Sequence, residues 1–201
     1  NELAKKLSQS IGMFYKIRKL SPPKILQSLY HAIFNSHMAY GLPIWGNTTE
    51  IHLKRIETLQ KKAIRAISNV DYNAHTSPIF KELNILKLKD QFDFQMASLL
   101  WDVDHDTIPA SFSAYFTKVR DTHSHETRQA TSGKFRVNRA NTLYGTRSFQ
   151  VQGSIVLNKL KDSDLYKLSS NKKIFLKKTL KTLKPQLSSR TKLSDPEWIP
   201  E

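Results

Sequence analysis

Residues 36–67 read SHMAYGLPIWGNTTEIHLKRIETLQKKAIRAI, and this stretch decides the fold of the 201-residue chain. A helix is expected to end at Tyr40-Gly41, because glycine is favoured just beyond a helix C-terminus. Pro43 should then prevent the short apolar segment 42–46 from continuing that helix. Asn47, with Glu50 three residues later, predicts a capping box that starts a new helix. We expect the rest of the chain to be helices packed against this corner.

The helix expected after Asn47 is strongly amphipathic. Its predicted inner face carries Ile51, Leu53, Ile56, Leu59, Ala63, Ile64 and Ile67. Its predicted solvent face carries Lys54, Arg55, Lys61, Lys62 and Arg65. This spacing is typical of an α-helix that buries one side and exposes the other.

Two helices are predicted before the corner. Residues 2–20 have apolar side chains at helical spacing, and the other side is basic through Lys5, Lys6, Lys16, Arg18 and Lys19. Pro22-Pro23 should end this helix and start the next, since proline is tolerated in a first helical turn. The second helix is expected to bury Ile25, Leu26, Leu29, Tyr30, Ile33, Phe34 and His37.

The part of the chain after residue 70 is also mostly helical in its pattern. Helices are predicted at 77–83, 88–101, 109–116, 151–160 and 171–183, with a loop at 120–132. Residues 134–138 alternate as in a strand, although a lone hairpin is only marginally stable. We therefore expect a mainly α, irregular multi-helix bundle with at most one short β-hairpin. The predicted divisions are a three-helix unit at 1–70, a helical region at 71–184 and a flexible tail at 185–201.

Composition restricts the classes of protein to which the chain can belong. There are 32 Lys and Arg against 17 Asp and Glu, a formal net charge of +15, which favours a polyanionic partner. The absence of cysteine excludes disulfides and thiolate metal sites and fits an intracellular protein, nuclear or cytoplasmic. No apolar run is long enough for a transmembrane helix, and residues 1–6 lack the apolar region of a signal peptide. With no initial methionine, the simplest expectation is that the chain begins inside a longer reading frame or has been trimmed.

Motifs for metal or catalytic chemistry are weak. The segment DVDHD at 102–106 resembles the start of a calcium loop, but Thr107 and Ser113 stand where glycine and glutamate are required. His123 and His125 lie in a polar segment without cysteines, so surface residues are the simpler interpretation. No phosphate loop, nucleophile elbow or paired-aspartate turn is present. We expect no cofactor, no metal and no self-sufficient enzyme in this segment.

The basic helices are the positive signal in the sequence. A third basic helix at 171–183 carries Lys172, Lys173, Lys177 and Lys178, with Ile174, Phe175, Leu176, Leu180 and Leu183 expected inward. Solvated charged faces are common on soluble helices, but three faces of one sign would together attract a phosphate backbone. Tyr15, Tyr40 and Trp45 could stack on bases, with core packing as the alternative for each.

Four blocks of the sequence, taken together, resemble a known family. The first combines Leu29-Tyr30, Ser36-His37, Tyr40-Gly41 and Trp45-Gly46 with LQKKAIR at 59–65, and the second is HETR at 125–128. The third is RSF at 147–149 followed by Gly153, and the fourth is IFLKK at 174–178. Their order and spacing resemble the region after the catalytic palm in non-LTR (LINE-like) retrotransposon reverse transcriptases. The third block departs from the family by having LNKLK at 157–161, without the usual tryptophan and proline.

The resemblance implies the thumb and C-terminal region of an RNA-directed DNA polymerase, whose catalytic aspartates lie in a palm that this segment does not contain. Its partners would then be RNA and DNA, as a template–primer duplex held by its backbone, and the palm itself. The expected contacts are Lys54, Arg55, Lys61, Lys62 and Arg65, then Lys16, Arg18 and Lys19, then Lys172, Lys173, Lys177 and Lys178. Tyr40, Gly41, Trp45 and Gly46 are expected to form the structural corner that orients the helix after Asn47.

Two other functions remain open from the sequence. The chain could be a non-enzymatic helical module that binds proteins, with the Trp45 corner as an anchor. A basic amphipathic binder of membrane surfaces is less favoured, since these helices need one another to bury their apolar stripes.

Overall fold

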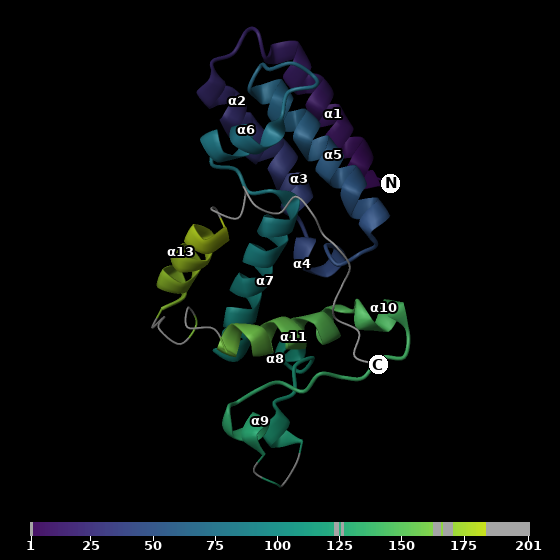
Figure 1. Cartoon of the computed structure of the whole chain (residues 1–201), viewed down its shortest axis with the longest axis vertical. Coiled ribbons are helices and arrows are strands. Elements are labelled where there is room, and N and C mark those ends of the chain that lie inside the picture. Colours follow the sequence, from purple (N-terminus) through teal and green to yellow (C-terminus); the bar gives the residue numbers. More distant parts are fainter. Residues whose placement is uncertain (1, 123–124, 126, 163–165, 167–170, 184–201) are drawn as a thin grey trace.

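The computed structural model describes residues 2–122, 125, 127–162, 166 and 171–183, and these residues form a mainly α fold (Figure 1). The helices of the first part are α1 (Glu2–Ile17), α2 (Pro23–Leu29), η1 (Tyr30–Asn35), α3 (Ser36–Ala39), α4 (Leu42–Trp45), α5 (Glu50–Ile67) and α6 (Thr76–Glu82). Those of the second part are α7 (Leu88–Asp104), α8 (Ala110–Ser113), η2 (Val119–Asp121), α9 (Arg128–Thr131), α10 (Leu143–Thr146), α11 (Phe149–Asp162) and α13 (Lys172–Leu183).

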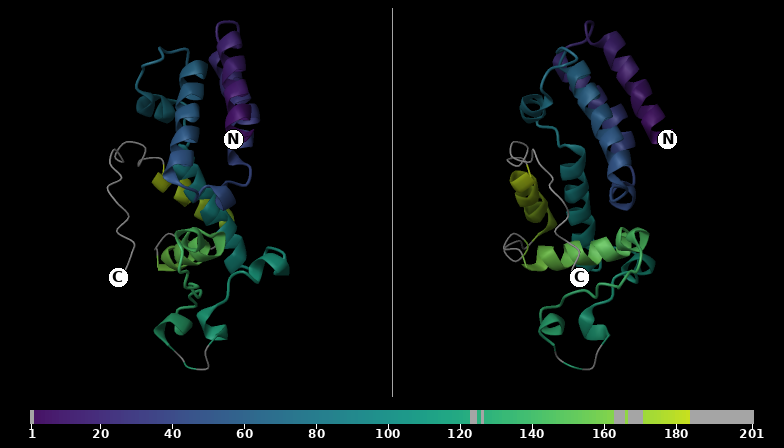
Figure 2. Two further views of the ribbon diagram at one scale, coloured as in Figure 1. Left: turned by 90° about the vertical axis from the view of Figure 1, so that its right-hand side faces the viewer. Right: turned by 45° about the vertical axis from the view of Figure 1, so that its right-hand side comes forward.

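The helix α7 connects the two parts of the molecule. At one end, α1 and α5 lie side by side, with the α2–α3 segment packed against them (Figures 1 and 2). At the other end α11 crosses α7, and α13 packs along α7 (Figure 2). One apolar cluster extends from Ala4 to Leu88, and two smaller ones gather around Leu100 and Trp101 of α7. The boundary at residue 70 stays a prediction, and the predicted tail lies outside the described residues.

The second predicted helix is one continuous rod with a π-helical centre. Its buried side chains recur every four residues, at Leu26, Tyr30, Phe34 and Met38. In a regular α-helix, steps of four residues drift by about 40° each around the axis. The wider winding of η1 counteracts this drift and keeps the four side chains on one line. The inward positions predicted for Ile25 and His37 are wrong, since both are exposed.

The corner between this rod and α5 is built from backbone contacts. Gly41 has φ 61°, a left-handed conformation that glycine adopts without strain. The prediction that 42–46 does not continue the preceding helix is confirmed: that helix ends at Ala39, and Leu42–Trp45 forms a separate short helix, α4, with Pro43 in its first turn. The indole Nε1 of Trp45 donates to the Tyr40 carbonyl at 2.9 Å. The capping box is wrong: Thr49 is the N-cap, and Asn47 instead donates from Nδ2 to the Arg147 carbonyl at 3.0 Å.

Gly46 brings the corner against α7. A Cβ at this position would lie 2.4 Å from the Phe92 ring and 2.6 Å from the Leu42 carbonyl oxygen. We expect Gly46→Ala to lower the free energy of unfolding by about 1–3 kcal/mol through overpacking, as measured by urea denaturation. Gly12→Ala is the matched control, because no atom lies within 4 Å of the added Cβ. A stability loss in Gly12→Ala equal to that in Gly46→Ala would contradict this account.

The second part contains one strand-like contact but no strand among its described residues. Lys118 and Phe135 form an isolated antiparallel bridge, so the alternating segment 134–138 does not form the hairpin that the sequence left open. Asn158 of α11 takes the place of a further strand: its Oδ1 accepts from the Phe135 N–H at 2.8 Å, and its Nδ2 donates to the Phe135 carbonyl at 2.8 Å. The segment predicted as a loop at 120–132 contains the end of η2 and the short helix α9.

The other predicted helices agree with the structure to within a few residues, and some inward positions differ. Ile51 and Ile174 are exposed, although both were expected to face the core. Ile51 lies in the first turn of α5, beside the corner rather than over the core. In α13, Phe175 is buried against Trp101 and takes the inward position.

Candidate nucleic-acid interface

The paired helices α1 and α5 bring two of the predicted basic sets together. They run side by side in the same direction, so the ends that carry Lys16 and Lys62 lie at the same end of the pair (Figure 1). Lys16, Lys19, Lys54, Arg55 and Lys61 are exposed, and Arg18, Lys62 and Arg65 are partly buried. One basic residue of each set, Arg18 and Lys62, lines the same pocket between the two helices.

Several of these basic groups also have partners within the chain. Lys54 pairs with Glu50 one turn earlier at 3.2 Å, on a well-exposed surface where such a pair stabilises little. The Arg65 guanidinium donates to the Ala74 carbonyl at 2.8 Å and lies 6.0 Å from the Tyr72 ring centroid. Arg18 lies 4.8 Å from the centroid of Tyr15. Arg65 therefore has a structural task in addition to its charge.

The third predicted basic set lies elsewhere. The helix α13 packs on α7, on a different side of the molecule from α1 (Figures 1 and 2). Lys172 forms an ion pair with Asp102 of α7, which neutralises its charge locally. Lys173 and Lys177 are exposed, and Lys178 is partly buried. The three basic helices therefore do not line one common groove, whereas α1 and α5 share a surface.

An open pocket of about 590 Å³ lies between α1, α5 and the segment that follows α5. Tyr15 of α1 and Arg18, just after it, line one side, Lys62 lines the pocket from α5, and Tyr72 lines it from the following segment. Tyr72 is 64% exposed, and the sequence pattern did not identify it. The signal that could have found it is an aromatic residue in a polar segment directly after the most basic helix.

The predicted corner residues differ in their surroundings. The Tyr40 side chain is 86% exposed, and Tyr40 contributes to the corner through its backbone: its N–H donates to the Ser36 carbonyl and its carbonyl accepts from the Trp45 indole. Trp45 is partly buried and packs against the first apolar cluster. Gly41 and Gly46 supply the left-handed turn and the close approach to Phe92.

Gln60, inside the basic helix α5, is a buried polar residue that the sequence pattern did not identify as structural. Its Nε2 donates to the Tyr30 hydroxyl at 3.1 Å and to the Leu86 carbonyl at 2.9 Å. Its Oε1 accepts from the N–H of Leu88, the first residue of α7, at 3.0 Å. One side chain thus links α5 to the π-helical rod and to the start of α7.

Tyr30 is expected to make the free energy of unfolding depend on pH in the alkaline range. Burial raises the pKa of the Tyr30 phenol well above its usual value of 10.0, and the hydrogen bond with Gln60 opposes this rise only in part. As the pH rises, the Tyr30 phenol therefore loses its proton in the unfolded chain before it does so in the folded chain. The free energy of unfolding is unaffected by this group below pH about 10 and falls as the pH rises above that value. In urea titrations from pH 9 to 11.5, we expect Tyr30→Phe to reduce the pH slope by up to about 1.4 kcal/mol per unit. An alkaline pH slope of Tyr30→Phe equal to that of the unchanged chain would contradict this account.

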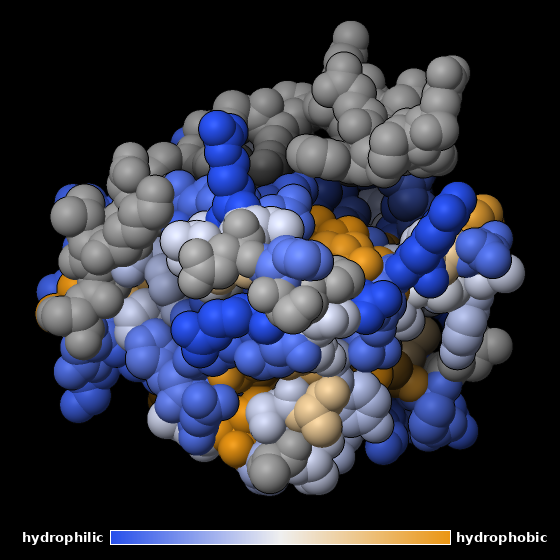
Figure 3. All heavy atoms as spheres, turned by 90° about the horizontal axis from the view of Figure 1, so that it is seen from below, coloured by the Kyte–Doolittle hydropathy of each residue, from blue (hydrophilic) through white to orange (hydrophobic). Residues whose placement is uncertain are grey.

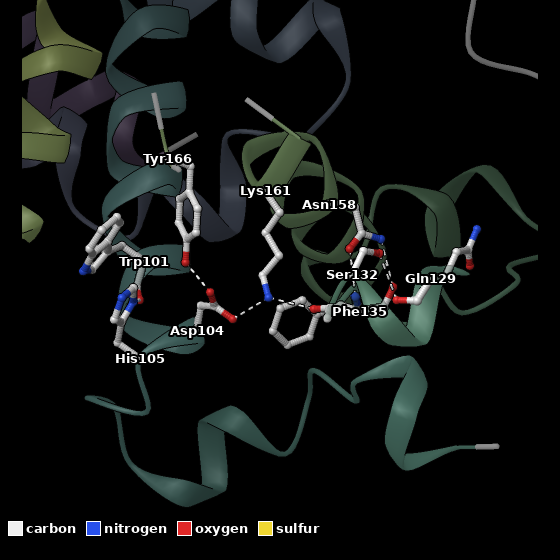
Figure 4. Close-up of polar contacts among 10 residues, drawn as sticks. Trp101, Asp104, His105, Gln129, Ser132, Phe135, Asn158, Lys161 and Tyr166 are labelled. Carbon is white, nitrogen blue, oxygen red and sulfur yellow. Dashed lines mark hydrogen bonds and ion pairs between the residues drawn. The ribbon is translucent and has the colours of Figure 1, made fainter. Parts of the chain in front are cut away.

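A second polar cluster lies where α7, α11 and the 133–135 segment meet (Figure 4). Asp104 pairs with Lys161 at 2.7 Å and accepts from the Tyr166 hydroxyl, while Lys161 also donates to the Gly133 carbonyl at 2.7 Å. Burial first, and then the hydrogen bond and charge of Asp104, raise the pKa of Tyr166 above its usual value. These groups form hydrogen bonds and an ion pair with one another, so the cluster links the segments that carry them. It offers no activated nucleophile.

The described residues offer little for other chemistries. No group of three or more metal-ligating side chains comes together among them, and His123 lies outside them. No helix within the described ranges is long and apolar enough to span a bilayer. The end of the molecule that includes α9 shows mostly hydrophilic side chains with small separate hydrophobic areas (Figure 3).

Comparisons with known proteins give one partial similarity. No protein-family profile matches the chain, and no solved structure matches it. Over 64 residues the chain is 33% identical to the RNA-directed DNA polymerase from the mobile element jockey of Drosophila melanogaster. The matched segment is 32% of this chain and 7% of that protein. Over this segment the chain is thus similar to a reverse transcriptase of a mobile element.

Proposed function

We propose that the chain is a thumb-like fragment of a LINE-like RNA-directed DNA polymerase and holds a template–primer duplex. In this proposal it has no catalytic centre of its own and would work beside the palm that carries one. The observation that carries the proposal is the side-by-side packing of α1 and α5, which both carry exposed lysines and whose basic residues Arg18 and Lys62 line one pocket. The similarity to the jockey polymerase supports the same enzyme class.

The proposed mechanism is contact with the nucleic-acid backbone. Lysine and arginine side chains neutralise phosphates and release counterions, which gives affinity without reading the base sequence. Long side chains on two neighbouring helices can follow a phosphate strand, and the exposed Lys16, Lys19 and Lys61 can do so without breaking an ion pair found among the described residues. Binding should therefore be salt-dependent and indifferent to sequence.

Photo-crosslinking would locate the contact surface. An RNA–DNA hybrid that carries photoreactive bases is irradiated with the full chain, and the modified peptides are identified by mass spectrometry. We expect crosslinks in α1 and in α5. Crosslinks confined to α13, or none from a folded sample that binds the hybrid, would contradict the proposed surface.

A protein-binding module is the second candidate, and exposed apolar side chains around the corner favour it. Tyr40, Ile44 and Ile51 are all largely exposed there. Such residues can anchor a protein partner. Capture from cell extract with and without nuclease separates the two functions, because partners held through nucleic acid are lost after digestion.

A further inference from the structure

Three kinds of side chain line the pocket between α1 and α5. Ile11, Leu59 and Val70 supply apolar surface, and Tyr15 and Tyr72 supply aromatic rings. Arg18 and Lys62 supply positive charge. Its volume of about 590 Å³ lies within the range of about 300–1,000 Å³ that is usual for sites that bind small groups.

Arginines lie beside both aromatic rings of the pocket. Arg18 lies over Tyr15 with 4.8 Å between the guanidinium carbon and the ring centroid, and Arg65 lies 6.0 Å from the centroid of Tyr72. The rings remain 37% and 64% exposed, so a planar group could still reach them. Aromatic rings beside positive charge are the arrangement by which proteins hold unpaired bases.

Gly12 and Asp71 also shape the pocket. A Cβ built on Gly12 meets no atom within 4 Å, so the absence of a side chain there keeps this side of the pocket open. Asp71 is the acid in the lining. A carboxylate repels a phosphate but accepts hydrogen bonds from the amino groups of bases, so a base rather than a phosphate suits the interior.

We propose that this pocket binds an unpaired nucleobase of a single-stranded segment next to the duplex. The base stacks on Tyr72 or Tyr15, and Arg18 and Lys62 contact the neighbouring phosphates. This inference rests on the proposed function, because the duplex contact along α1 and α5 would deliver the single strand to the pocket. It adds recognition of a junction between duplex and single strand to simple backbone binding.

The test compares a blunt RNA–DNA hybrid with the same hybrid that carries a short single-stranded extension. Anisotropy with the full chain should show about tenfold tighter binding of the extended hybrid. The extension is made in RNA and in DNA, and an advantage with either supports the inference, the larger one identifying the preferred strand. An extension of abasic units keeps the phosphates but should remove the advantage. If the abasic extension binds as well as the normal one, the effect is electrostatic and the inference is overturned.

Variants of pocket residues test whether the tighter binding of the extended hybrid depends on the pocket. Tyr72→Ala removes a ring and Gly12→Phe fills the pocket, and both should bring the ratio of the two affinities close to one. Tyr72→Phe keeps the ring and should retain the ratio, and Tyr144→Ala removes an exposed tyrosine of α10 and should have no effect. Affinity for the blunt hybrid should change less than about twofold in all four variants, because no lysine is removed.

The outcomes separate the two proposals. If the wild-type chain binds both hybrids equally, the pocket does not take a base, and the proposed duplex contact stands. If Tyr72→Ala and Gly12→Phe keep the preference for the extension, the base binds elsewhere and the inference is wrong. If the folded chain binds neither hybrid, the proposed function fails and the inference fails with it.

Discussion

Replacement of Lys16, Lys19, Lys61 and Lys62 by glutamine is expected to weaken binding of an RNA–DNA hybrid by roughly a hundredfold near 100 mM salt. Each lysine–phosphate interaction that is removed should also lower the slope of log K against log salt concentration by about 0.9, so the four together should lower it by about three to four. The loss of affinity should be equal for hybrids of different sequence, because backbone contacts carry no sequence information. Anisotropy titrations at several salt concentrations measure both quantities.

A charge-matched variant controls for net charge. Lys81, Lys173, Lys177 and Lys181 are exposed on α6 and α13, and their replacement by glutamine removes the same charge from other surfaces. We expect this control to reduce the affinity by only a few-fold, through the long-range field. Equal reductions in the two variants would show that total charge, rather than the α1–α5 surface, determines binding. Arg65 is left intact because its guanidinium holds the Ala74 carbonyl.

Gln60→Leu is expected to have the largest effect on stability, a loss of about 2–5 kcal/mol in the free energy of unfolding. The leucine would fit the volume, but it would leave the Leu86 carbonyl, the Leu88 N–H and the Tyr30 hydroxyl without the partners that Gln60 provides. Each buried polar group left without a hydrogen bond costs about 1–3 kcal/mol. Urea denaturation followed by circular dichroism measures the loss.

Gln9→Leu is the matched control for this prediction. Gln9 lies exposed on α1, and the same replacement there should change stability by less than about 0.5 kcal/mol. If Gln60→Leu were as stable as Gln9→Leu, the buried hydrogen bonds would contribute nothing net. The link between α5 and the start of α7 would then depend on apolar packing alone.

Amphipathic periodicity made the long helices predictable. The stripes Leu7, Ile11 and Phe14 in α1 and Ile56, Ala63 and Ile64 in α5 are buried as the spacing indicates. The mainly α fold followed from these stripes, because each helix has one face that only another helix can cover. Pro22-Pro23 and Gly41 likewise mark true helix limits, since their backbone preferences are local.

The features that the sequence did not predict depend on contacts between distant segments. Asn47 has the local pattern of a helix cap, yet its side-chain amide donates a hydrogen bond to the Arg147 carbonyl in the second part of the molecule. The alternation at 134–138 resembles a strand, but the side chain of Asn158 supplies the partner that a second strand would have supplied. The π-helical winding of η1 occurs where the rod packs against α1 and α5, and no local pattern indicated it.

The candidate interface was predictable in its residues and less so in its arrangement. Charge pattern selected α1, α5 and α13, but a pattern along the chain does not say which helices become neighbours. Packing places α1 beside α5, and it pairs Lys172 of α13 with Asp102 of α7. Tyr72 enters the pocket only because the segment after α5 turns back over that helix pair, where Arg65 holds Ala74.

Salt-dependent binding of a labelled RNA–DNA hybrid to the full chain tests the central claim most directly. Anisotropy titrations from about 50 to 300 mM salt should give a linear log–log plot with a slope of several ions, the same for hybrids of unrelated sequence. This result would show that the chain binds a phosphate backbone without the rest of a polymerase, and the two lysine variants then locate the surface. No binding at about 50 mM salt by a folded sample would contradict the claim.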